Sequence, residues 1–292
     1  MVAFLARDLW TKVVMLFLIF TSILWGLSFG LIKSQLSGFD PTLIAFLRLA
    51  ISFLVFLPFL RKVKPSLSMN LIWIGAVQFG AMYCLYIRSY AYLSGAQIAL
   101  LTITTPLLVV AWDGLLHRRF PKHFWLAALL SVTAGAILVW ADLHWSQRLK
   151  GVLLMQAANA VFALGQVLYK KIAPAGPPHR HFAWLYLGGF LVPLGLLLPG
   201  DLPTLPQTQG AWLALLYLGA IASGAGFFLW NQGIRRVSNG VVAVMNNLKI
   251  PLGAFLAWLI FKEHLELSRW IPCAILFGLA FLPLRKELRN PR

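Results

Sequence analysis

The stretch "LIWIGAVQFGAMYCLY" at residues 71–86 decides the fold, because a related stretch, "LLYLGAIASGAGFFLW", recurs at residues 215–230. The offset between them is 144 residues. Small residues agree in register as well as apolar ones, which a chance likeness of two apolar helices does not explain. We interpret the two stretches as equivalent parts of an internal repeat. The glycines that coincide are Gly75 with Gly219 and Gly80 with Gly224.

The repeat continues downstream of both stretches. "SGAQIALLTITTP" at residues 94–106 aligns with "NGVVAVMNNLKIP" at residues 239–251, at an offset of 145. A weaker match pairs "WGLSFGLIK" at residues 25–33 with "FALGQVLYK" at residues 162–170. The order of the matched stretches is the same in both halves, so the second half of the chain repeats the first.

Composition places the chain among membrane proteins. Of its 292 residues, 60% are apolar and only 11% are charged, against roughly 45–50% and about 25% in soluble domains. Ten apolar runs are long enough to cross a bilayer as helices. The sequence therefore predicts an all-α polytopic membrane protein with ten transmembrane helices. The runs are residues 13–35, 41–60, 70–91, 95–116, 122–142, 151–171, 181–199, 210–230, 239–261 and 268–285.

Basic residues are divided unevenly between the two sides of the predicted bundle. The net charge is +17, but Lys and Arg lie between apolar runs and form no single basic face, which argues against a nucleic-acid-binding domain. The terminal segments and the loops on their side carry 17 Lys and Arg, and the opposite loops carry 6. Because basic loops remain in the cytoplasm, we predict a multi-pass protein of the bacterial inner membrane with both termini cytoplasmic.

Each repeat contains five spans, the first over residues 13–142 and the second over residues 151–285. Because five is odd, the second repeat crosses the membrane in the opposite sense. Inverted repeats of this kind are common in secondary transporters, in which the halves rock against each other around a substrate site near the midplane. A single chain supplies the whole pathway, so the predicted mechanism requires no oligomer.

Five segments carry a family resemblance: "WGLSFGLIK" (25–33), "AFLRLA" (45–50), "GAQIALLTITTPLLV" (95–109), "NGVVAVMNNLKIPLG" (239–253) and "WLIFKEHLELSRW" (258–270). In this order they resemble EamA-type members of the drug/metabolite transporter superfamily. The amino-acid sequences of the last two segments are most similar to a branch that carries carboxylates, amino acids and amines. The resemblance implies a ten-helix secondary transporter with a central cavity, of a kind that often exports small metabolites or amino acids.

Lys249 lies about ten residues from either end of the ninth span. A lysine at that depth costs about 2.5–3.5 kcal/mol on insertion scales, so such residues face the bundle interior or a wet cavity. On a regular helix Lys249 shares a stripe with Asn246. Pro251 cannot donate to the carbonyl of Asn247, which predicts a broken, polar midpoint. We predict that Lys249, Asn246 and Asn247 bind a carboxylate; the alternative is a lysine that caps carbonyls of a neighbouring helix.

The fourth span contains the counterpart of this midpoint. Thr102 and Thr104 precede Pro106, which frees the carbonyl of Thr102 in the same way. Pro106 and Pro251 are therefore predicted to break their helices and shape the cavity. Each threonine either lines the site or bonds to its own backbone.

One more cation and two aromatic residues complete the predicted site. Arg48, within the second span, has a planar fork suited to a carboxylate or a phosphate. Binding to carbonyls and snorkelling outward are the alternatives for its side chain. Trp25 and Tyr83 also lie within spans, and beside a cationic centre their rings suit an apolar part of a substrate. Most membrane Trp and Tyr residues instead belong to interfacial belts.

These features predict a secondary transporter that exports amino acids or related carboxylates. A rival in the same class carries nucleotide sugars or phosphorylated metabolites, which are also anionic. The alternative from another class is a membrane-embedded enzyme that uses Lys249; the inverted repeat and the missing catalytic partners argue against it. The expected partners are a small-molecule substrate and the lipid bilayer, with no catalytic residue, metal or cofactor.

Overall fold

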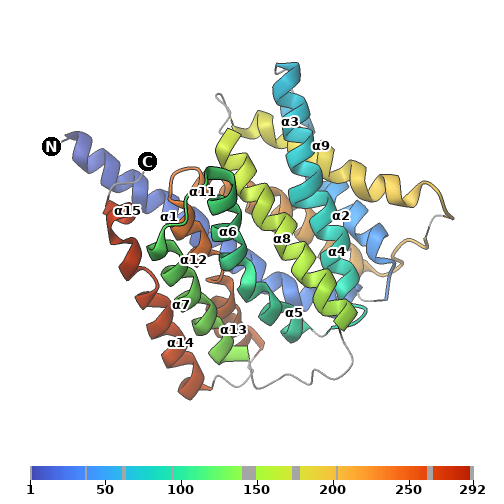
Figure 1. Cartoon of the computed structure of the whole chain (residues 1–292). Coiled ribbons are helices and arrows are strands. Elements are labelled where there is room, and N and C mark those ends of the chain that lie inside the picture. The colour runs from blue at the N-terminus through green and yellow to red at the C-terminus, as the bar shows by residue number, and fades with distance from the viewer. Residues whose placement is uncertain are drawn as a thin grey trace.

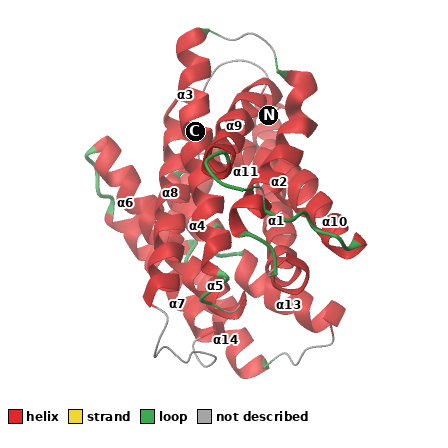
Figure 2. Ribbon diagram, turned by 90° about the vertical axis from the view of Figure 1, so that its right-hand side faces the viewer, coloured by secondary structure: helices red, strands yellow, loops and turns green. Residues whose placement is uncertain are grey.

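The computed structural model describes residues 2–36, 38–60, 64–93, 95–139, 149–172, 178–201, 203–261 and 266–289. All regular elements in these ranges are helices (Figures 1 and 2), and they pack side by side as one bundle. Labels with η mark 3-10 or π-helical segments. In chain order the elements are α1 (Val2–Leu31), η1 (Ile32–Leu36), α2 (Pro41–Phe56), η2 (Leu57–Phe59), α3 (Pro65–Gly75), η3 (Ala76–Ala81), α4 (Met82–Ser89), α5 (Gly95–Leu101), η4 (Thr102–Thr104), α6 (Thr105–His117), α7 (Lys122–Val139), α8 (Leu149–Ile172), α9 (Pro178–Leu197), α10 (Gln209–Leu216), η6 (Tyr217–Ala225), α11 (Gly226–Ile234), α12 (Asn239–Met245), α13 (Lys249–Phe261), α14 (Leu267–Leu279), η7 (Leu282–Leu284) and α15 (Arg285–Arg289).

The helices agree with the ten predicted spans. Within the described residues, eight helical segments are long and apolar enough to cross a membrane. The predicted fifth span coincides with a shorter apolar helix, Lys122–Ile137, and the ninth coincides with α12 and α13, which a turn separates. The prediction of an all-helical polytopic membrane protein is therefore confirmed. The apolar side chains that the bundle leaves exposed suit contact with lipid.

The fourth and ninth spans are interrupted at matching places. α5 ends at Leu101, the 3-10 segment η4 follows, and α6 begins at Thr105. α12 ends at Met245, a turn over residues 246–248 follows, and α13 begins at Lys249. Each break lies just ahead of one of the two matched prolines, as predicted. A proline fits the first turn of a helix, where its missing N–H costs nothing, and each of the two lies in the first turn of the second half of its span.

The carbonyls that the two prolines cannot serve are hydrogen-bonded to other groups. The carbonyl of Asn247 accepts from the backbone N–H of Ile250 at 3.0 Å. The carbonyl of Thr102 accepts from the backbone N–H of Thr105 and also from the Thr105 hydroxyl at 2.7 Å. At each break the chain tightens to bonds between residues three apart, which satisfy the oxygens that proline leaves behind.

The third and eighth spans share an irregularity as well. η3 and η6 are π-helical, and they contain the matched glycines Gly80 and Gly224. π-helical insertions are uncommon and frequently lie at functional sites. Their occurrence at equivalent points of the two halves supports the interpretation of the chain as a repeat.

Contacts between the two halves also occur in related pairs. Exchanging each helix for its repeat partner turns one set of contacts into the other, as two inverted five-helix repeats require. The related pairs are α3 and η3 on α9 with α10 and η6 on α2, α4 on α8 with α11 on α1, and α6 on α8 with α13 on α1. The self-related pairs are α2 with α9 and α7 with α14.

Matched small residues make this close packing feasible. A Cβ atom at Gly75 would lie 1.8 Å from the carbonyl oxygen of Leu185 in α9. In the other half, a Cβ atom at Gly219 would lie 2.7 Å from the Cβ atom of Ile51 in α2. Close backbone approach through small residues is the usual way in which membrane helices associate. The glycines of the opening stretch therefore set how the two halves meet.

Candidate functional site

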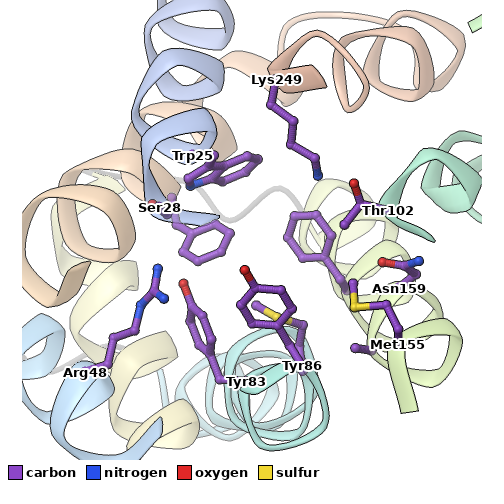
Figure 3. Close-up of a pocket in the computed structure, with 13 residues that line it drawn as sticks. Trp25, Ser28, Arg48, Tyr83, Tyr86, Thr102, Met155, Asn159 and Lys249 are labelled. Atoms are coloured by element: carbon purple, nitrogen blue, oxygen red, sulfur yellow. The ribbon is translucent and has the colours of Figure 1, made fainter. Parts of the chain in front are cut away.

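A pocket lies between the two halves, close to the broken helices (Figure 3). Its cavity volume is about 80 Å³, less than the about 300–1,000 Å³ typical of small-molecule sites. Both repeats contribute to the wall. The lining residues are Trp25, Ser28, Arg48, Met82, Tyr83, Tyr86, Thr102, Met155, Ala158, Asn159, Phe162, Phe227 and Lys249.

Arg48 is held rigidly at one side of the pocket. Its side chain is only 2% exposed, and its Nε donates to the Ser223 hydroxyl at 2.7 Å. The guanidinium lies 4.3 Å from the ring centre of Tyr83, a cation–π distance. The Tyr83 hydroxyl is 2.8 Å from the same Ser223 oxygen. The Nη1 atom of Arg48 is buried and has no hydrogen-bond partner among the described residues, so it is free to bind a ligand.

Lys249 enters the pocket from the break in the ninth span. It is the first residue of α13 and is 6% exposed. Its ammonium nitrogen lies 5.7 Å from the ring centre of Trp25, whose indole N–H is fixed by the carbonyl of Ala222 at 3.0 Å. Within the described chain, the ammonium has no ion-pair or hydrogen-bond partner. It does not cap the carbonyls of a neighbouring helix, which was the alternative considered from the sequence.

Two polar residues lie on the same side of the pocket as the Lys249 ammonium (Figure 3). Thr102, predicted from the sequence, donates its hydroxyl proton to the carbonyl of Ala99 at 2.6 Å. Asn159 of α8 was missed. Its Nδ2 donates to the carbonyl of Leu101 at 2.7 Å and to the Thr104 hydroxyl at 3.2 Å. A single amide in a mid-span position gave no reason to prefer it over its neighbours, although polar residues at that depth are usually functional.

The rest of the wall is apolar and aromatic. The Trp25 ring lies 4.9 Å from the Phe227 ring and 5.9 Å from the Phe162 ring, measured between centroids. Met82 and Met155 add flexible thioethers, which adapt to irregular ligands. The sequence does not single out Phe162, Phe227, Met82 or Met155, because an aromatic or thioether side chain within a span is most often part of the packing. They make the pocket suitable for a substrate with an apolar body.

Five of the eight predicted binding residues line this pocket: Trp25, Arg48, Tyr83, Thr102 and Lys249. The other three lie outside its lining. Asn246 donates to the carbonyl of Val242 at 2.9 Å and to Gln166 Oε1 at 3.3 Å. Asn247 donates to the carbonyls of Ile103 and Ser131 at 3.1 and 3.2 Å. Thr104 donates to the carbonyl of Leu101 at 3.0 Å, and its oxygen is 2.7 Å from Gln156 Oε1.

The rotation of the ninth span explains where the asparagines point. The stripe shared by Asn246 and Lys249 holds only for an unbroken helix of 3.6 residues per turn. The turn over residues 246–248 changes that rotation, so the lysine faces the pocket while both asparagines face neighbouring helices.

The charge of the pocket is unbalanced. Arg48 and Lys249 both line it, and no Asp or Glu is among its described lining residues. Buried cations in a membrane protein ordinarily pair with an acid or with carbonyls. The arrangement therefore suits a ligand that brings its own negative charge. For the described part of the chain, no cluster of three or more His, Cys, Asp or Glu suited to a metal ion is found.

The family model described as "EamA-like transporter family" matches residues 12–141 and again residues 149–283. The two matched ranges together cover most of the chain, one in each half.

Individual relatives are also similar over most of their length. A "Probable biotin transporter" of Pseudomonas aeruginosa is 41% identical over 265 residues, covering 87% of this chain and 92% of the relative. A "Biotin transporter" of Escherichia coli is 36% identical over 288 residues, covering 95% of each. A "Riboflavin transporter" of Vibrio cholerae is 25% identical over 274 residues, covering 88% and 89%. A solved crystal structure matches with a TM-score of 0.76 over 94% of this chain and 98% of its own, at 19% identity, and so supports the fold alone.

Proposed function

The chain belongs to the EamA-like transporter family, and on that premise we propose that it carries biotin, or a closely similar carboxylate, across the bacterial inner membrane. Family membership makes it a secondary transporter of a small metabolite and not an enzyme. Relatives at 36–41% identity over nearly the whole chain are named for biotin. The choice of substrate rests on these names together with the chemistry of the pocket.

The observation that carries the proposal is the unbalanced charge of the pocket. Arg48 and Lys249 face it without an acidic partner among the described lining residues, and a carboxylate supplies the missing negative charge. Biotin has one carboxylate, a polar cyclic urea and an apolar thioether ring with an alkyl chain. The cations and amide suit its polar groups, and the rings and thioethers of the wall suit its apolar parts.

Amino acids, the substrates expected from the sequence, have less support. None of the relatives cited above is named for an amino acid. A zwitterion would also bring an ammonium group into a pocket that already holds Arg48 and Lys249. Like charges at short range in a poorly solvated site repel strongly. A carboxylate without an ammonium group is therefore the better substrate.

Alternating access is the mechanism that this arrangement favours. The first repeat, residues 13–142, contributes Arg48 and Thr102 to the pocket, and the second, residues 151–285, contributes Asn159 and Lys249. Rocking one repeat against the other would open the shared pocket to one side of the membrane and then to the other.

The test is flux of labelled biotin in reconstituted liposomes. The unaltered protein is expected to carry biotin unchanged, and Lys249→Ala is expected to reduce flux to that of empty liposomes, because it removes half of the positive charge of the pocket. Lys286→Ala, at an exposed position, serves as the control and should retain full flux. Full flux in Lys249→Ala, with both proteins folded and inserted, would reject the role of this lysine.

Direction is read from intact cells. Export, predicted from the family resemblance, would lower the labelled biotin retained by cells that express the protein, and import would raise it.

A second candidate substrate is a phosphorylated metabolite or a nucleotide sugar. Two cations balance a dianionic phosphate more fully than a single carboxylate, and an arginine fork binds phosphate well. Competition decides between the two. An excess of the phosphorylated compounds should leave biotin flux unchanged if biotin is the substrate. If the phosphorylated compounds are the substrates, the same excess should suppress the flux of labelled biotin.

A further inference from the structure

The two polar ends of the pocket differ in hydrogen-bonding character. At the Arg48 end the groups are a guanidinium and the hydroxyls of Tyr83 and Tyr86, drawn together in Figure 3. The hydroxyl of Ser28 nearby already donates to the carbonyl of Leu24 at 2.9 Å. No amide or carboxylate oxygen is among the described lining residues at this end. The Arg48 end therefore offers a guanidinium that can only donate, surrounded by hydroxyls, of which that of Ser28 can only accept.

The Lys249 end offers a donor together with acceptors. Asn159 uses its Nδ2 to donate to the carbonyl of Leu101, and only the amino side of an amide can make that bond, which fixes its orientation. Its oxygen is left for the pocket, toward which it is turned in Figure 3. Thr102 spends its proton on the carbonyl of Ala99, so its oxygen faces the pocket as an acceptor. The ammonium of Lys249 supplies the donor.

The polar groups of biotin have the complementary difference. A carboxylate only accepts hydrogen bonds, and it binds best to charged donors, above all to arginine. A cyclic urea has one carbonyl oxygen between two N–H groups. It needs a donor for the oxygen and acceptors for the N–H groups, which are what Lys249, Asn159 and Thr102 provide.

We propose that the pocket binds its substrate in one orientation, with the carboxylate at Arg48 and the urea ring at Lys249, Asn159 and Thr102. This inference rests on the proposed function. It makes Asn159 a specificity-determining residue. It also gives the two cations different tasks: Arg48 selects for the acid, and Lys249 selects for the urea oxygen.

Two analogues of biotin separate these tasks. Biotinamide replaces the carboxylate by a neutral amide, and 2-iminobiotin replaces the urea oxygen by a protonated nitrogen, so that the ring becomes a cation with donors only. The measurement is the concentration of each analogue that halves labelled biotin binding to purified protein in detergent. The unaltered protein should prefer biotin over both analogues by about tenfold or more, since each analogue loses a charge-assisted hydrogen bond.

Each variant should then lose one preference, for biotin over biotinamide or for biotin over 2-iminobiotin, and keep the other. Arg48→Gln is expected to lose the preference over biotinamide and to keep the preference over 2-iminobiotin. Lys249→Gln is expected to do the reverse. The opposite division, or loss of both preferences in both variants, overturns the orientation.

Asn159→Asp is a second test for the case in which the other variants fail to fold. It keeps the shape of the side chain and adds a negative charge beside the ring. It should improve relative binding of 2-iminobiotin about tenfold. A gain for biotinamide instead would place the carboxylate at the Lys249 end and overturn the proposal. If the unaltered protein binds no biotin, the proposed function is rejected. If it binds biotin but the variants lose the opposite preferences, only the proposed orientation is rejected.

Discussion

Arg48 owes its position in the pocket to residues of the other half of the chain. Its Nε donates to Ser223 of η6, and the neighbouring Ser52 donates to the carbonyl of Gly219 at 2.7 Å. Gly219 lies against the Arg48 backbone, because a Cβ atom there would be 3.0 Å from the Arg48 carbonyl oxygen. A guanidinium held in this way loses little conformational freedom when it binds an anion.

Ser223 holds the guanidinium of Arg48 in place. Ser223→Ala removes the partner of both Arg48 Nε and the Tyr83 hydroxyl, so the guanidinium loses its fixed geometry. The KM for biotin is expected to rise about tenfold, as for loss of a charge-assisted hydrogen bond. The measurement is initial flux against biotin concentration in liposomes. Ser268→Ala, at an exposed site, is the control and should keep its KM. An unchanged KM in Ser223→Ala would show that Arg48 does not depend on this bond.

At the scale of elements, the two broken spans support each other. Asn247, in the break of the ninth span, donates to the carbonyl of Ile103 in the break of the fourth. It also donates to the carbonyl of Ser131 in α7. Buried carbonyls need such partners where a helix is interrupted inside a membrane. Asn247 thus joins two elements behind the pocket, in contrast to the substrate-binding role predicted for it from the sequence.

The contact between α3 and α9 gives an element-scale prediction. A Cβ atom at Gly188 of α9 would lie 1.9 Å from the carbonyl oxygen of Ile72, so Gly188→Ala must push the helices apart. Its free energy of unfolding is expected to fall by roughly 1–3 kcal/mol, seen as a lower midpoint of thermal unfolding in detergent. Gly195→Ala lies in the same helix, where nothing is within 4 Å of the added carbon. That control should be neutral or stabilising, by less than about 1 kcal/mol. Equal midpoints for the two variants would contradict the close packing.

At the scale of the whole molecule, polar side chains join the two halves at the ends of α6 and α12. The carboxylate oxygen of Asp113 in α6 accepts from Asn239 Nδ2 of α12 at 2.6 Å. The amide oxygen of Asn239 accepts in turn from Lys170 of α8 at 2.8 Å. Lys33, which matches Lys170 in the repeat, is exposed instead. The polar contact of Lys170 is therefore not repeated at the matching lysine.

A cross-link at this end should stop transport. In a background with Cys84→Ala and Cys273→Ala, the pair Asp113→Cys and Asn239→Cys is bridged by a short bifunctional thiol reagent whose spacer contains a disulfide. The bridge joins the two repeats, so flux is expected to fall to background and to return when a reductant cleaves the spacer. Lys170→Cys with Asn239→Cys bridges two helices of one repeat and should leave flux intact. Undiminished flux through the bridged first pair would argue against rocking of the halves.

Orientation is the last whole-molecule prediction. The excess of Lys and Arg in the terminal segments and the loops on their side leads us to propose that both termini lie in the cytoplasm. Alkaline phosphatase, which is active only outside the cytoplasm, should be inactive when fused to either terminus. A fusion in the loop over residues 203–208 should be active. Activity at either terminus would reverse the orientation.

The sequence by itself determined the class of fold, the number of spans, the repeat and the places where two spans break. These are properties of composition, periodicity and internal likeness, which need no knowledge of what lies beside what. The matched glycines Gly75 and Gly219 are visible in the sequence, and the structure brings helices close together at both. Pro106 and Pro251 marked the breaks, because proline removes the same backbone donor wherever it occurs.

Only the tertiary structure decided which polar side chains face the pocket. Thr102 and Thr104 look alike in the sequence, yet the first lines the wall and the second bonds behind it. The breaks rotate each following half-helix by an amount that packing sets. Asn246 and Lys249 therefore face different directions, although a regular helix would align them. Asn159 is held at the pocket by a hydrogen bond to the carbonyl of Leu101, a residue distant in the sequence. The direction in which a side chain points depends on neighbours far away in the chain. Those neighbours are known only once the helices are packed.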